Sequence, residues 1–356
     1  MMKPSILLVG NFLSSQGGNL TIAEELAIYF ERAGYSIVTT SSMRSRLLRL
    51  LNMLFTVYAR RTDYEIVLVS VFSGPAFLWA EMVSRLLELL RKPYILSLHG
   101  GELPAFASRW SGRVKRLLQN ANMVTAPSPY LQTAMRSYRE DIVLVPNPLD
   151  LQNYPFRLRS MPKPHLVWLR AFHNIYNPQM APLLIANLLP SFPEITLTMI
   201  GPDKGDGSLQ ATQTVIEELG LQNHIRIMPG IPKNEVSAYL GCADIFINTT
   251  NVDNTPVSVL EAMACGLCVV STDVGGIPDL LDAGQDALLV PPNNPETMTN
   301  AIKRILTESG LAAWLSANAG KKAAQFDWPT LLPKWESVFE KTIQTPNPMT
   351  VYDGLF

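Results

Sequence analysis

Short apolar runs alternate along this chain with longer amphipathic segments. The short runs are rich in Val, Ile and Leu and are bounded by Gly, Pro or Asn, which is typical of buried parallel strands. The longer segments repeat apolar residues at spacings of three and four, which is typical of helices that cover a sheet. Because this strand–helix order recurs in both halves, the pattern predicts an α/β protein with two doubly wound domains.

The pattern places strands and helices as follows. Strands are predicted at residues 5–9, 35–40, 64–71, 94–98, 121–126 and 142–145, and then at 165–169, 196–200, 225–228, 243–248, 268–272 and 287–290. Helices are predicted at residues 20–33, 43–61, 76–91, 209–219, 234–240, 257–265, 296–307, 312–326 and 328–342. A chain of 356 residues is long for one core and suits two domains.

Charge is shared unevenly between the halves. Residues 1–150 hold 16 Lys and Arg against 11 Asp and Glu, a net +5, and residues 151–356 hold 13 against 19, a net −6. A basic first half suggests an anionic acceptor or an anionic membrane surface for that half, and we expect no nucleic-acid partner. We find no signal peptide and no apolar run long enough to span a bilayer, so we expect a cytoplasmic protein.

The predicted helix at 43–61 has polar residues at positions 46, 49, 52, 56 and 60, which form one narrow polar stripe. Such a helix is too short to span a membrane, but it could lie in the membrane interface with its arginines on lipid phosphates, at the inner face of the membrane. The alternative is a crossover helix that covers a parallel sheet. We favour the crossover helix.

The three cysteines, Cys242, Cys265 and Cys268, predict no metal or redox site. Cys265 and Cys268 form a C-x-x-C, but they lie within apolar sequence and have no partner ligands. We interpret them as core thiols in a reducing compartment. No Asp-x-Asp follows a predicted strand, so the sequence predicts no metal site and no cofactor.

The stretch from Asp253 to Pro278 is the richest in candidate chemistry. Pro256 suits the first turn of a helix that Thr255 or Asn254 could cap, and Glu261 is the only charge on that helix. A helix N-terminus attracts an anion, and acids on either side of it suit a nucleotide sugar. The alternative is a buried helix with one paired Glu and a capping Asp, and spacing alone leaves both interpretations open.

This stretch resembles the signature of the retaining glycosyltransferases of family 4, whose fold is GT-B. The family pattern is an acid, seven residues, and then Glu-Ala-Met-Ala-x-Gly-x-Pro-Val-Val, followed by a Gly-Gly loop. The chain has Asp253, seven residues, the run Glu261-Ala-Met-Ala-Cys-Gly-Leu-Cys-Val-Val270, and Gly275-Gly276. It departs from the pattern at Asp253, where the family usually has Glu, and at Cys268, where the family usually has Pro.

The resemblance implies two Rossmann-like domains that face each other across a cleft containing the active site. It places an acceptor-binding domain at residues 1–160 and a nucleotide-sugar-binding domain at residues 161–327. The helix at about 328–345 is expected to pack back on the first domain, and residues 346–356 to form a mobile tail. It further implies a retaining, metal-independent transferase with a nucleotide-diphosphate sugar as donor and a carbohydrate or glycolipid acceptor, as in cell-surface polysaccharide or glycolipid assembly.

Site residues follow from the same resemblance. The residues expected in catalysis are Asp253, His99 and Arg170. Those expected to bind the donor are Glu261, Gly17, Gly18, Asn254, Thr255, Pro256, Val257, Ser258 and Gly230, and those expected on the acceptor side are Gly100, Gly101 and Glu102. The family also has a Lys about six residues after Arg170, where this chain has Tyr176, and Lys204 is the candidate substitute.

Two other functions fit the same sequence. One is a nucleotide-sugar epimerase of GT-B fold, which needs no acceptor. The other is a binding module without catalysis, suggested by the missing Lys and the shortened acid. Turnover of a sugar nucleotide with and without an acceptor separates the three functions.

Overall fold

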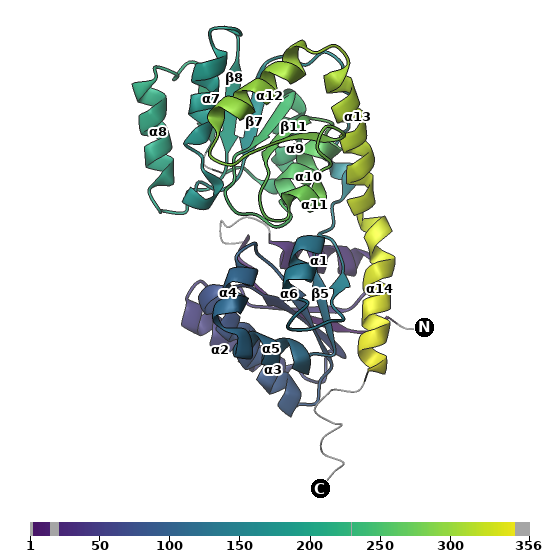
Figure 1. The fold of residues 1–356 in the computed structure, drawn as a ribbon. Coiled ribbons are helices and arrows are strands. Elements are labelled where there is room, and N and C mark those ends of the chain that lie inside the picture. Colours follow the sequence, from purple (N-terminus) through teal and green to yellow (C-terminus); the bar gives the residue numbers. More distant parts are fainter. Residues whose placement is uncertain (1–2, 15–20, 229, 346–356) are drawn as a thin grey trace. The chain divides into compact units, whose positions relative to one another are not determined.

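The structure, a computed structural model, describes residues 3–14, 21–228 and 230–345. The chain divides into two compact units (Figure 1). Unit 1 contains residues 1–148 and 328–356, and unit 2 contains residues 149–327. The segment 149–160, which the sequence analysis assigned to the first domain, lies in unit 2.

Unit 1 contains a six-stranded parallel sheet in the order β2-β1-β3-β4-β5-β6. Its strands are β1 (Ile6–Val9), β2 (Ile37–Thr40), β3 (Ile66–Val71), β4 (Tyr94–Leu98), β5 (Met123–Ala126) and β6 (Val143–Leu144). Alternate residues of β1 enter two separate cores: Leu7 and Val9 enter one, and Ile6 and Leu8 the other. The sheet is therefore covered on both faces, as the continuous apolar strands predict.

Two groups of helices cover the two faces of this sheet. One core contains residues of α2 (Arg46–Ala59), α3 (Phe77–Leu89), α4 (Leu103–Arg109), α5 (Ser111–Asn120) and α6 (Pro129–Met135). The other contains residues of α1 (Ile22–Arg32) and α14 (Trp328–Gln344). Phe30 of α1 packs edge-on against Trp335 and Phe339 of α14 at centroid distances of 5.6 and 5.2 Å. The last helix thus packs on the sheet of unit 1.

Unit 2 repeats the architecture with strand order β12-β11-β10-β7-β8-β9, again parallel. Its strands are β7 (His165–Leu169), β8 (Thr196–Ile200), β9 (Ile225–Met228), β10 (Ile245–Asn248), β11 (Cys268–Thr272) and β12 (Ala287–Val290). On one face lie α7 (Met180–Leu188), α8 (Ser208–Glu218) and α12 (Pro295–Thr307). On the other lie α9 (Val236–Cys242), α10 (Val257–Ala264) and α11 (Ile277–Leu280), and α13 (Leu311–Ala323) contributes to both cores. The prediction of two doubly wound domains is confirmed.

The prediction missed α7, α5 and the short helices α4, α6 and α11. Helix α7 is apolar on nearly all sides and contains Pro182, so its sequence shows neither a polar stripe nor an unbroken helical pattern. Cys265 and Cys268 are buried free thiols, as predicted, but Cys242 is exposed. In the described part of the chain no helix is both long and apolar enough to cross a membrane.

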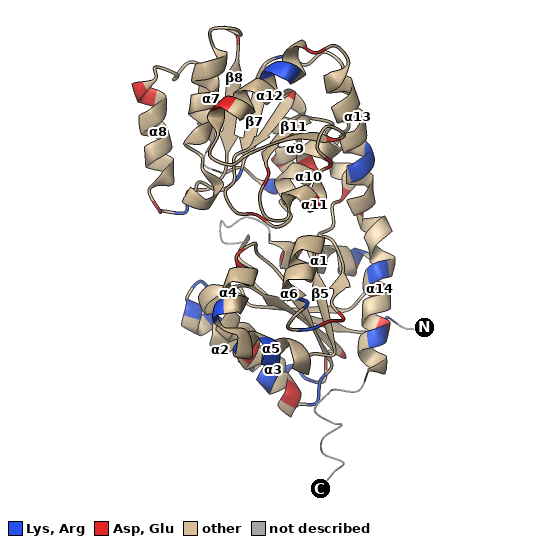
Figure 2. Ribbon diagram, viewed as in Figure 1, with Lys and Arg blue, Asp and Glu red and all other residues tan. Residues whose placement is uncertain are grey.

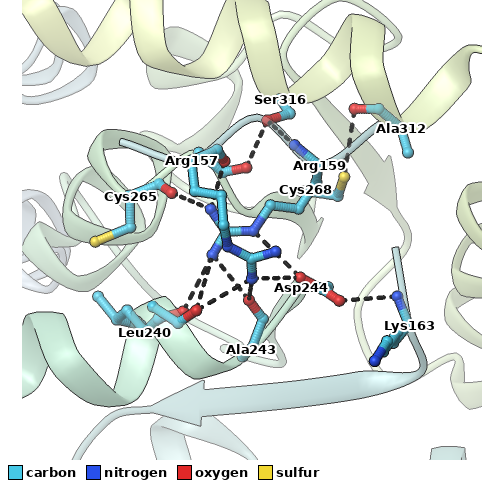
Figure 3. A network of polar contacts seen from close by, with 12 residues as sticks. Arg157, Arg159, Lys163, Leu240, Ala243, Asp244, Cys265, Cys268, Ala312 and Ser316 are labelled. Carbon is cyan, nitrogen blue, oxygen red and sulfur yellow. Dashed lines mark hydrogen bonds and ion pairs between the residues drawn. The ribbon is translucent and has the colours of Figure 1, made fainter. Parts of the chain in front are cut away.

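A buried arginine near the start of unit 2 forms hydrogen bonds to the C-terminal ends of α9 and α10 (Figure 3). Arg159 is 1% exposed, and its guanidinium donates to the carbonyls of Ala243 and Cys265, at the C-terminal ends of α9 and α10. Its Nε lies 3.3 Å from the Asp244 carboxylate, which also accepts from the Lys163 backbone N–H at 2.8 Å. Because helix C-termini carry partial negative charge, a guanidinium is well placed there.

Candidate functional site

The N-cap residue of α10 provides no side-chain hydrogen bond to the helix. Pro256 is itself the N-cap, with extended φ −71° and ψ 115°, and its carbonyl accepts from Val259 N at 3.1 Å. The predicted helix start at Val257 is confirmed, but the prediction that Thr255 or Asn254 is the N-cap is wrong. Pro256 is extended and its side chain cannot accept a hydrogen bond, so the N-cap residue leaves the first N–H groups of α10 without a side-chain cap.

Two hydroxyl groups lie at this end of the helix. Thr255 and Ser258 are each 8% exposed, and their side-chain oxygens are buried without a hydrogen-bond partner in the described structure. Buried polar groups are nearly always paired, so two hydroxyls without a partner beside a helix N-terminus make this helix start a candidate for ligand binding. Hydroxyl and N–H donors together suit an anion such as a phosphate.

The Gly275-Gly276 loop sets the position of Asp253. A Cβ on Gly275 would lie 2.0 Å from the Asp253 carbonyl oxygen, and one on Gly276 would lie 2.3 Å from the Asn254 carbonyl oxygen. Gly276 N also donates to the Asp253 carbonyl at 3.2 Å. The paired glycines are therefore required because two segments of backbone meet there, and this contact holds Asp253 at the edge of the sheet.

Asp253 forms an ion pair with Arg170, which follows β7. Both side chains are nearly buried, at 12% and 13% exposed, and Asp253 Oδ1 accepts from Asn254 N at 2.9 Å. Burial raises the pKa of Asp253, and the Arg170 charge opposes that increase. Arg170 also lies over the Tyr176 ring, 4.1 Å from its centroid, and its Nε is buried with no hydrogen-bond partner among the described residues. Tyr176, at the position where the family pattern has Lys, thus supports the guanidinium.

Glu261 is buried on α10 and accepts from two groups that the sequence analysis did not identify. Tyr154 donates its hydroxyl to Glu261 Oε1 at 2.7 Å, and Lys233 Nζ pairs with the same oxygen. Both contacts fall on Oε1, and none is recorded for Oε2 in the described residues. Lys233 thus places a cation beside α10. Its only sequence signal is a Pro-Lys-Asn-Glu turn, which looks like any surface turn.

Lys204 and Gly230 lie in the loops that follow the carboxyl ends of β8 and β9 in unit 2. Lys204 is exposed, and its backbone N–H donates to the carbonyl of Phe172, two residues after Arg170, at 3.1 Å. Gly230 follows β9 with φ +106°. The structure records no side-chain contact between Lys204 and Arg170 within the described chain, and the substitute role of Lys204 stays a prediction.

In unit 1, His99 follows β4 and is 7% exposed. Its backbone N–H donates to Val71 O at 2.9 Å, and its ring stacks on Phe72 with a centroid distance of 5.0 Å. Burial lowers the pKa of His99 to about 4, so the imidazole is neutral at physiological pH. A neutral imidazole donates one hydrogen bond and accepts one, which suits a hydroxyl group better than a phosphate.

The acceptor-side candidates follow His99 directly. Gly100 has φ +86°, a conformation that favours glycine, and Gly101 continues the turn. Glu102 is exposed and begins α4, where its carbonyl accepts from Phe106 N at 3.1 Å. Gly17 and Gly18 lie outside the described residues. Among the described residues no group of three or more His, Cys, Asp and Glu could hold a metal ion.

Comparison with known proteins gives two family models that match this chain. The model described as "Glycosyl transferases group 1" matches residues 159–322, and the one described as "Glycosyltransferase Family 4" matches residues 15–153. Among curated proteins, a D-inositol 3-phosphate glycosyltransferase of Corynebacterium jeikeium is 29% identical over 168 residues, covering 46% of this chain and 40% of the relative. The chain thus spans less than half the length of the curated relatives it matches.

Solved structures resemble nearly the whole chain. Sucrose-phosphate synthase from Thermosynechococcus elongatus gives a TM-score of 0.79 at 16% identity, with 95% of this chain and 98% of that one covered. The Anabaena protein HepE, solved in complex with UDP and glucose, gives 0.76 at 17% identity, with 95% and 99% covered. At these identities the likeness shows the fold: GT-B, with two Rossmann-like domains.

Proposed function

We propose that this protein is a retaining glycosyltransferase that moves a sugar from a nucleoside-diphosphate sugar to an acceptor hydroxyl. The observation that carries this proposal is the start of α10, where two buried unpaired hydroxyls lie beside the Arg170–Asp253 pair. The two family models, which match both halves of the chain, support the same reaction class. HepE was solved with UDP-glucose, so UDP-sugars are the first donors to test.

In this proposal the diphosphate lies at the N-terminus of α10. The N–H groups of Val257 and Ser258 and the hydroxyls of Thr255 and Ser258 would donate to it, and Arg170 would grip it as a fork. Asn254 and Pro256 shape the entrance, and Gly230 and the loop of Lys204 flank the nucleotide. The helix dipole and the guanidinium would stabilise the leaving diphosphate, so the reaction would need neither metal nor cofactor.

Glu261 is proposed to hold the ribose of the donor. Lys233 and Tyr154 bind Oε1 and fix the carboxylate, and Oε2 then serves the ribose hydroxyls. Glu261→Ala is expected to weaken donor binding by about 1–3 kcal/mol, the scale for hydrogen bonds to a charged group. Calorimetric titration of UDP-glucose checks this, with exposed Asp279→Ala as the control. An unchanged dissociation constant in Glu261→Ala would remove this residue from the donor site.

In the transfer itself, the bond between the anomeric carbon and the phosphate oxygen breaks, and its electron pair goes to the diphosphate. The acceptor oxygen bonds to the anomeric carbon on the same face, and its proton passes to the departing phosphate oxygen. Asp253 would stabilise the positive charge that develops on the sugar. His99, neutral at physiological pH, is proposed to hydrogen-bond a sugar hydroxyl, and Gly100, Gly101 and Glu102 to contact the acceptor.

Arg170→Lys is expected to lower turnover about 10- to 100-fold, the equivalent of losing one charge-assisted hydrogen bond of about 1.5–3 kcal/mol. A lysine is a point charge and cannot grip two phosphate oxygens while stacked on Tyr176. Initial rates with a sugar nucleotide measure the effect, and Arg226→Lys on β9, which is exposed, is the matched control. Turnover close to wild type would show that α10 and Lys204 suffice for the diphosphate.

The test of the function is turnover of UDP-, GDP- and ADP-sugars, preselected by thermal shift, with and without added carbohydrate or glycolipid acceptors. A transferase releases nucleoside diphosphate much faster when its acceptor is present. Conversion of the donor sugar at equal rates without acceptor would indicate an epimerase. Donor binding without turnover under any condition would indicate a binding module and overturn the proposal.

A further inference from the structure

Helix α2 presents its apolar side to solvent. Leu47, Leu48, Leu51, Phe55 and Tyr58 are each 53–69% exposed, and their spacing places them along one side of the helix. The residues buried against the rest of unit 1 are Arg49, Met53 and Val57. The helix does lie against the sheet, as a crossover helix must, but with its smaller apolar face inward. We call the five exposed residues the α2 ridge.

The inward arginine explains this orientation. Arg49 is 7% exposed, and its guanidinium donates to the Met43 carbonyl at 2.7 Å and to Asn11 Oδ1 at 3.0 Å. It also lies over the Trp79 ring at 5.2 Å. These contacts hold part of the polar stripe toward the protein, so the ridge on the other side of the helix points outward. Contiguous apolar patches of this kind mark interaction surfaces.

Positive charge flanks the α2 ridge. Arg44 and Arg46 stand at its start and Arg60 and Arg61 at its end, and Asp63 is the only acid in residues 43–63. Arg61 lies over the Tyr58 ring at 4.6 Å. Residues 103–120, whose helices cover the same face of the sheet, add Arg109, Lys115 and Arg116, whereas Arg113 is paired with Glu81 of α3. Figure 2 shows Lys and Arg on this side of unit 1.

We propose that the α2 ridge docks on the surface of a lipid bilayer that contains anionic headgroups. A helix of 14 residues, about 21 Å long, would lie in the plane of the interface. Its leucines and Phe55 would enter the boundary between headgroups and acyl chains, and the flanking arginines would contact lipid phosphates. The docking is independent of the transferase activity, and if both hold, the acceptor is one presented at a membrane.

A second copy of this chain is a less suitable occupant of the ridge. In a two-fold pairing of antiparallel α2 helices, Arg44 and Arg46 of one copy meet Arg60 and Arg61 of the other. Four like charges would then face each other at each end of the interface. Anionic phosphates instead complement both ends of the helix together.

Vesicle flotation of the 356-residue chain tests the proposal, using phosphatidylcholine vesicles with and without phosphatidylglycerol. The wild type is expected to float with anionic vesicles at low salt and to bind neutral vesicles less. The pair Leu51→Gln and Phe55→Gln removes apolar contact without changing charge, and it should lower the partition coefficient by at least about tenfold. The pair Arg44→Gln and Arg46→Gln should reduce the preference for anionic lipid.

The matched control carries Leu219→Gln and Ile343→Gln, two exposed apolar residues away from α2, and should bind like the wild type. Circular dichroism and melting temperature verify that each variant is folded. Absence of flotation at low salt, or equal flotation of the α2 and control variants, would overturn the proposal. So would a wild-type dimer that the Leu51 and Phe55 substitutions convert to monomer without any change in lipid binding.

Discussion

Asp253→Asn is expected to lower kcat by about 100- to 1,000-fold, the range seen when one group that stabilises transition-state charge is removed. The Asp253→Asn variant is expected to bind nucleoside diphosphate more tightly than the wild type does. The reason lies in the ion pair: Asp253 neutralises Arg170 in the free protein, and a diphosphate must compete for that guanidinium. Asparagine keeps the shape of the side chain but removes the negative charge that competes for Arg170. The same change removes the carboxylate that would stabilise positive charge on the sugar.

Initial rates and a calorimetric titration with UDP separate these two effects. Asp253→Glu is the matched control, because it keeps the charge and restores the longer acid of the family pattern, and it should retain more activity than the Asn variant. Full activity in Asp253→Asn would mean that the charge has no catalytic role. Weaker UDP binding in that variant would contradict the competition between carboxylate and phosphate.

Arg159→Met is expected to destabilise unit 2 by about 3–5 kcal/mol, the range for breaking a buried ion pair on one side. The substitution removes the hydrogen bonds that Arg159 donates to the carbonyls at the ends of α9 and α10. It also removes one of the two ion pairs that Asp244 forms with arginines. Arg157→Met is the control, because Arg157 binds the same carboxylate but is 54% exposed. Because solvent screens the exposed Arg157 guanidinium, its removal is expected to cost less than removal of Arg159.

Urea unfolding followed by circular dichroism measures both variants against the wild type. The account predicts that Arg159→Met lowers the free energy of unfolding more than Arg157→Met does. Equal losses would show that the network in Figure 3 contributes no more than a surface contact. Because this network anchors the C-terminal end of α10, mild destabilisation is also expected to reduce donor binding at the other end.

The most buried strands of both units were predictable because they form nearly unbroken apolar runs. Tyr94–Leu98, His165–Leu169 and Cys268–Thr272 have the predicted bounds. Helix ends were less predictable, as Pro256 illustrates. Whether a proline is the first helical residue or the N-cap depends on one ψ angle, which the sequence does not specify.

The candidate site was predictable where chemistry and spacing coincide in one stretch, as at Asp253 and Glu261. It was not predictable where partners come from distant segments. Lys233 stands 28 residues before Glu261, and Tyr154 stands 107 residues before it. Periodicity likewise gives the polar stripe of α2 but not the direction in which it points, because Arg49 is buried through contacts with Asn11 and Trp79.

The central claim, transfer of a sugar from a nucleotide with retention, is tested most directly by proton NMR of the reaction as it proceeds. The experiment uses the donor and acceptor that give turnover, and it follows the anomeric proton of the first product. The account predicts that the product has the anomeric configuration of the donor and appears together with free nucleoside diphosphate. A product of inverted configuration would contradict the account.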